Sequence, residues 1–66
     1  MEGWIPVTER LPEHEDEVIV TAKYESRDGT FVAIDWFDFS DNNWFNNPNN
    51  VTAWMEMPEA YKGEES

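Results

Sequence analysis

The sequence contains no cysteine, so neither a disulfide bridge nor a thiolate zinc site can stabilise its fold. Basic residues are also scarce: the chain has only Arg10, Lys23, Arg27 and Lys62, and they are scattered. Because proteins bind the nucleic-acid backbone with clustered lysine and arginine, we do not expect direct contact with nucleic acid.

Long apolar runs are absent as well. No stretch is long enough to span a membrane, and the negative charge would be repelled by an anionic leaflet. The first residues, Met1-Glu2-Gly3-Trp4, have neither the basic nor the apolar region of a signal peptide. We therefore expect a protein of the cytoplasm that does not bind membranes.

The usual sequence signatures of catalysis are missing too. There is no glycine-rich phosphate loop, nucleophile elbow or zinc motif. His14, the single histidine, lies in an acidic run and is interpreted as a solvated loop residue, since a general base needs a positioned partner and a pocket. Asp35, Asp38 and Asp41 lack the glycine turn and closing glutamate of a calcium loop. We predict a protein that is not an enzyme and has no cofactor or metal.

Acidic and aromatic residues are what the chain has in excess. Fifteen acidic residues give a formal net charge of −11 over 66 residues, whereas a charge of roughly 2–8 is enough to keep a small domain soluble. The aromatic content of 15% is too high for a disordered acidic tail. These two features predict one folded domain over residues 1–59, followed by a flexible acidic tail over residues 60–66.

Alternating apolar residues predict a small antiparallel sheet. Residues 18–24 alternate as a half-buried strand, and the Asp28-Gly29 turn joins them to a second strand over residues 30–39. Because both faces of residues 30–39 are apolar, we expect that strand to be central and covered on each side. Trp44-Phe45 is predicted as a short third strand.

Residues 51–57 are predicted as the last strand, with Val51, Ala53, Met55 and Met57 on one face. Pro6 lacks a backbone donor, which restricts residues 4–7 to an edge strand or an extended arm. The predicted fold is mostly β: a three- to four-stranded antiparallel meander, closed by the extended N-terminal arm, with little or no helix.

Both ends of the sequence resemble one family. Residues 4–13, which read WIPVTERLPE, resemble the opening of the domain of unknown function 551 family, and residues 51–59, VTAWMEMPE, resemble its closing motif. Ala53 and Glu56 stand where that motif usually has histidine and proline. The resemblance implies a small protein of bacteriophages, prophages and their hosts, with no established activity. It points to accessory functions such as inhibition of host defence.

The acidic residues are the candidate partner-binding site. One patch is expected at Glu13, Glu15, Asp16 and Glu17, and another at Asp35, Asp38 and Asp41. Trp44 lies in a turn-rich segment, where it would be either an exposed binding anchor or part of the cover of the sheet.

Two hypotheses follow for the function. In the first, the acidic surface docks on a basic protein surface. With the origin that the resemblance implies, that surface is the nucleic-acid-binding groove of a host CRISPR or restriction complex, and the chain is a nucleic-acid mimic in the host cytoplasm. In the second, the acid serves only solubility. The chain is then a structural or interaction module, or a homodimer, that uses its aromatic surface and a sheet edge.

Overall fold

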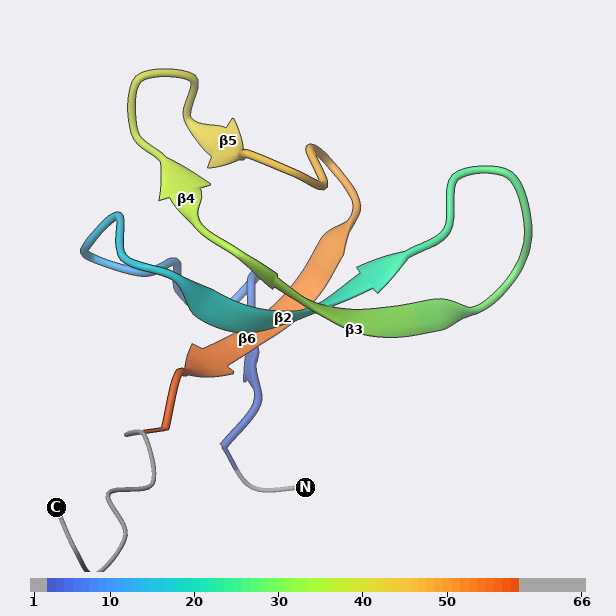
Figure 1. The fold of residues 1–66 in the computed structure, drawn as a ribbon, viewed down its shortest axis with the longest axis horizontal. Coiled ribbons are helices and arrows are strands. Elements are labelled where there is room, and N and C mark those ends of the chain that lie inside the picture. The colour runs from blue at the N-terminus through green and yellow to red at the C-terminus, as the bar shows by residue number, and fades with distance from the viewer. Residues whose placement is uncertain (1–2, 59–66) are drawn as a thin grey trace, which may run out of the picture.

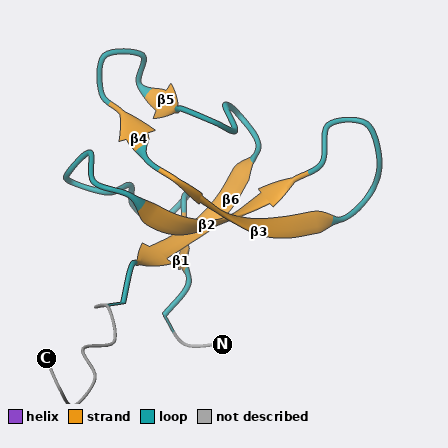
Figure 2. Ribbon diagram, in the orientation of Figure 1, coloured by secondary structure: helices purple, strands orange, loops and turns teal. Residues whose placement is uncertain are grey.

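The computed structural model describes residues 3–58, and within them the chain forms strands and no helix (Figure 2). The strands are β1 (Ile5–Pro6), β2 (Val18–Lys23), β3 (Thr30–Asp35), β4 (Phe37–Asp38), β5 (Asn43–Trp44) and β6 (Val51–Glu56). All pairings are antiparallel, so the mostly β prediction is confirmed. The tail expected over residues 60–66 lies outside the described residues.

The hairpin of β2 and β3 follows the sequence pattern. Val18 pairs with Asp35 and Lys23 with Thr30, with an unbroken register between them. Gly29 has a φ of 114°, which a side chain would disfavour, and its carbonyl accepts a hydrogen bond from the Tyr24 N–H at 3.2 Å. The predicted Asp28-Gly29 turn therefore closes this hairpin.

The order of strands in the main sheet is β1-β6-β2-β3 (Figure 1). The last strand inserts between the N-terminal arm and β2, which is where the sheet departs from a simple meander. The prediction that residues 30–39 form the central strand is wrong, because β3 is an edge strand and the strand breaks at Trp36. Its apolar outer residues Val32 and Ile34 are 64% and 51% exposed.

A β-bulge changes which residues of β6 share a face. Ala22 pairs with Val51 and Thr21 pairs with Ala53, so Thr52 is an extra residue in β6. The extra residue shifts the in-and-out alternation of side chains by one position. Val51 and Trp54, which are three residues apart, are therefore both buried on the core side of the sheet. The predicted face of Val51, Ala53, Met55 and Met57 is therefore divided between the two sides of the sheet.

The core lies on one side of the main sheet only. Val18, Val20, Ala22 and Trp54 face it from the sheet, and the small β4–β5 ribbon folds back to add Phe37 and Trp44 (Figure 1). Ile5 and Val7 of the N-terminal arm pack against its margin. Among residues 3–58, the arm and the β4–β5 ribbon thus both cover this side of the main sheet.

Candidate functional site

Asp35 is the one acidic residue of the candidate set that the structure buries completely. Its Oδ1 accepts hydrogen bonds from the Trp36 and Asn46 N–H groups at 2.8 and 2.9 Å. Its Oδ2 accepts from the backbone N–H and the Nδ2 of Asn47, both at 3.0 Å. The prediction that Asp35 contributes to a surface patch is therefore wrong, because its carboxylate is buried and three of its four hydrogen bonds hold the asparagine loop, residues 46–50, against the end of β3.

Trp44 does not lie on the surface either. It is 5% exposed and packs edge-on against Phe37, with 5.4 Å between the ring centroids. The second alternative for Trp44, that it covers the sheet, is the one the structure supports. The exposed aromatic residues of this region are its neighbour Phe45 and Phe39, at 55% and 48% exposure.

The acidic loop over residues 13–17 is fastened to the fold at two points. The Phe39 N–H donates a hydrogen bond to Glu15 Oε2 at 3.0 Å, which ties the loop to the β4–β5 turn. The His14 Nε2 lies 3.2 Å from both carboxylate oxygens of Glu56, at the end of β6.

Both nitrogens of the His14 ring are engaged. The Asp16 N–H donates a hydrogen bond to His14 Nδ1 at 3.2 Å, and Nε2 contacts the Glu56 carboxylate. His14 thus joins the acidic loop to the end of β6. Sequence reasoning missed Glu56, whose only signal was its departure from the family motif.

These contacts gather carboxylates at one end of the molecule, beside the start of β2 and the β4–β5 turn (Figure 1). We call this group the acidic end; its members are Glu13, Glu15, Asp16, Glu17, Asp38, Asp41 and Glu56. Asp38 Oδ1 accepts from the Ser40 N–H at 2.9 Å, so it also shapes the turn. The hydrogen bond between Glu15 and the Phe39 N–H thus brings the first predicted patch beside the turn that carries Asp38 and Asp41.

The basic side chains are placed elsewhere. The Arg10 guanidinium lies 5.4 Å from the Trp54 ring centroid, and that of Arg27 lies 4.1 Å from the Tyr24 ring. Between residues 3 and 58, no lysine or arginine forms an ion pair with a carboxylate, and the ion-pair contacts that exist involve His14. The carboxylates of the acidic end are thus not neutralised by lysine or arginine within this part of the chain.

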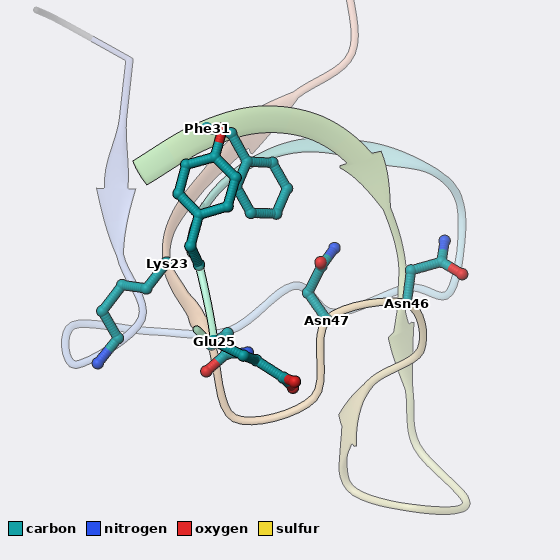
Figure 3. Close-up of a pocket in the computed structure, with 7 residues that line it drawn as sticks. Lys23, Glu25, Phe31, Asn46 and Asn47 are labelled. Atoms are coloured by element: carbon teal, nitrogen blue, oxygen red, sulfur yellow. The ribbon is translucent and has the colours of Figure 1, made fainter. Parts of the chain in front are cut away.

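An open pocket of about 350 Å³ lies on the other end, between the β2–β3 hairpin and the asparagine loop (Figure 3). Tyr24 and Phe31 form its aromatic wall, with ring centroids 4.8 Å apart. Two of its polar side chains already bond to the protein: Asn50 Nδ2 donates to Glu25 at 3.2 Å, and Asn47 Nδ2 donates to Asp35 at 3.0 Å.

In the described part of the chain, no three acidic, histidine or cysteine side chains come close enough together to hold a metal ion. No helix that could cross a membrane occurs among residues 3–58.

Comparison with known proteins identifies the family of this chain but names no activity, ligand or partner. The model of the family described as "Protein of unknown function (DUF551)" matches residues 3–62. No curated protein and no solved structure matches the chain. Because the family match spans nearly the whole sequence, including the Trp4 and Trp54 segments whose side chains build the arm and the core, the chain belongs to the DUF551 family.

Proposed function

We propose that this chain is a non-enzymatic binding protein whose acidic end docks on a basic protein surface. The observation that carries the proposal is the local imbalance of charge: the acidic end has no arginine or lysine partner within residues 3–58. Its loop is also held in place, through Glu15 on the Phe39 N–H and through His14 on Glu56. A fixed array of uncompensated carboxylates attracts and orients a cationic partner.

Exposed aromatic residues next to the acidic end favour a protein partner. Phe39 is 48% exposed, and the hydrogen bond from its backbone to Glu15 places it within the acidic surface. Aromatic residues are enriched in protein interfaces, where they provide most of the buried apolar area. The expected partner surface is therefore basic and has an apolar pocket for Phe39.

The finer form of the proposal is that the basic surface is a groove built for nucleic acid. Duplex DNA carries one charge per roughly 1.7 Å of axis, and a groove that binds it is lined with lysine and arginine. Carboxylates on a small folded frame can occupy such a groove. In the phage setting that the family resemblance implies, the partner is a CRISPR or restriction complex in the bacterial cytoplasm, which the chain would inhibit.

The test separates local charge from total charge. The acidic-end variant Glu13→Gln/Asp16→Asn/Asp41→Asn and the control variant Glu9→Gln/Glu25→Gln/Asp28→Asn remove the same number of exposed carboxylates. Binding to a decalysine peptide, measured by titration calorimetry, should weaken about tenfold in the acidic-end variant and less than about threefold in the control. Binding by the parent should also weaken steeply with salt, because exposed charges are screened.

A second readout concerns protein partners. Proteins retained from a bacterial lysate by the parent and the control variant, but not by the acidic-end variant, should be basic. Equal losses in the two variants would mean that the acid acts only through net charge. The alternative, in which the acidic coat serves solubility alone, would then stand.

A further inference from the structure

The side of the main sheet opposite the core carries an apolar surface, which we call the open face. It consists of Ile19, Thr21, Val32, Ile34, Ala53 and Met55. The strand register places these residues in two rows across the sheet: Ile34 pairs with Ile19, which pairs with Met55, and Val32 pairs with Thr21, which pairs with Ala53. Directly paired residues project to the same side, so the rows are contiguous.

The six residues of the open face are uncharged; the two on β3 are exposed and the other four are partly buried. Val32 is 64% and Ile34 is 51% exposed, whereas Val18, Val20 and Ala22 on the opposite side are fully buried. None of its six residues is acidic, although the chain has fifteen acidic residues. A contiguous exposed apolar patch on a small, highly charged protein marks an interaction surface.

The charges at the two ends of β2 indicate what covers this face. Lys23, the last residue of β2, lies on the same side of the sheet as Ile19 and Thr21. Glu17 directly precedes β2, and the alternation of side chains along the strand assigns it to this side as well. A twofold axis that runs across the strands at the level of Val20 and Ala33, midway between residues 17 and 23, sets Glu17 of one copy against Lys23 of the other. The arrangement is self-complementary, as an isologous interface requires.

We infer that two copies of this chain pack their open faces together as a sandwich dimer. In this geometry the strands of the two sheets are antiparallel and aligned, as in packed β-sheets, and Val32 of one copy meets Ile34 of the other. Each copy keeps its acidic loop at its own end of the dimer, apart from that of its partner. The inference does not depend on the proposed function: the acidic end borders the open face only at Glu17, which the acidic-end variant leaves unchanged.

The size of the open face sets the strength of the dimer. Three strands of six residues cover about 20 Å by 15 Å, or about 300 Å², which is less than half of the roughly 800 Å² per partner in a standard stable interface. Repulsion between two chains of charge −11 weakens association further. We therefore expect a dissociation constant of about 0.1–1 mM at moderate salt, decreasing as salt is added.

Sedimentation velocity from about 10 µM to about 1 mM measures this directly. The parent should shift from monomer to dimer across the range, and Val32→Lys should stay monomeric even though it lowers the net negative charge. Leu11→Lys is the matched control: it places the same charge on an exposed apolar residue away from the open face and should dimerise like the parent. A parent that is monomeric at every concentration, or a Val32→Lys variant that dimerises normally, would overturn the inference.

A charge-swap cycle tests the register. Glu17→Lys and Lys23→Glu should each weaken the dimer about three- to tenfold, and the double swap should restore the parent value to within about twofold. A double swap as weak as either single change would contradict the twofold arrangement.

Isotope-filtered NMR on a mixture of labelled and unlabelled protein identifies the occupant of the face. Contacts between the methyl groups of Ile19, Ile34 and Met55 should be found between copies. If those methyl groups contact only Tyr61 of their own chain at every concentration, the C-terminal residues are the occupant and the dimer is excluded.

Discussion

Asn47 donates two hydrogen bonds to a single oxygen of Asp35, one from its backbone N–H and one from its Nδ2, both at 3.0 Å. This pair joins the end of β3 to the loop that leads into β6. Asp35 is fully buried and receives two more N–H donors on its other oxygen. An ionised carboxylate is suited to this position because it only accepts hydrogen bonds.

Asp35→Asn should therefore destabilise the fold strongly. The new NH₂ group would face N–H donors in a buried site, which leaves polar groups unpaired and costs about 2–4 kcal/mol. That is a large share of the roughly 3–10 kcal/mol expected for a chain of this length. Urea unfolding followed by circular dichroism measures the change. Asp41→Asn makes the same chemical change on an exposed side chain and should stay within about 0.5 kcal/mol of the parent.

Two adjacent aromatic residues should respond very differently to truncation. Trp44→Ala removes a side chain that is 5% exposed and should cost about 3–5 kcal/mol, enough to unfold a domain of low stability. Phe45→Ala removes a half-exposed ring stacked 4.7 Å from Trp36 and should cost about 1 kcal/mol. Thermal unfolding of the two variants gives the comparison, and similar losses would contradict the burial of Trp44.

The contact between His14 and Glu56 should order the acidic loop more than it stabilises the fold. The side chains are 37% and 63% exposed, so the pair contributes only about 0.5 kcal/mol after solvent screening. His14→Ala also removes the acceptor of the Asp16 N–H, and this amide should exchange faster with solvent. Glu56→Gln keeps the Asp16 bond intact and serves as the control. An unchanged exchange rate in His14→Ala would show that the loop is held by Glu15 alone.

Gly29→Ala should weaken the β2–β3 hairpin. A φ of 114° is strained for any residue with a Cβ, although the space beside it is adequate, with Tyr24 carbons at 3.6 and 3.7 Å. The expected loss is about 1–2 kcal/mol in the free energy of unfolding. Ser26→Ala, in the same loop, should be nearly neutral. A neutral Gly29→Ala would show that the turn adopts another conformation in solution.

The sequence predicted the parts of the fold that depend on local pattern. Alternation identified β2, the Asp28-Gly29 pair located its turn, and Pro6 limited β1 to an edge. The apolar outer face of β3 was misread because two apolar faces are typical of a central strand, while here one of them is left open.

Burial of single residues was harder to predict because it depends on contacts distant in sequence. Asp35 and the exposed Asp41 have the same side chain, and the amides of residues 46 and 47 bind only the first of them. Trp44 and Phe45 are neighbours that point in opposite directions. The joining of the two acidic patches likewise depends on Glu15 reaching the Phe39 N–H, a contact over 24 positions that no local pattern contains.

Thr52, the extra residue of the bulge, has a consequence for how the protein can change through evolution. Without it, Trp54 and the residues after it would exchange sides, so the indole would leave the core and Ala53 and Met55 would enter it. Single substitutions within β6 leave the other side chains on their own sides of the sheet. An insertion or deletion of one residue would instead exchange the buried and exposed side chains of the strand. Insertions and deletions in related sequences should therefore avoid the segment between Val51 and Trp54 and occur instead in the loops.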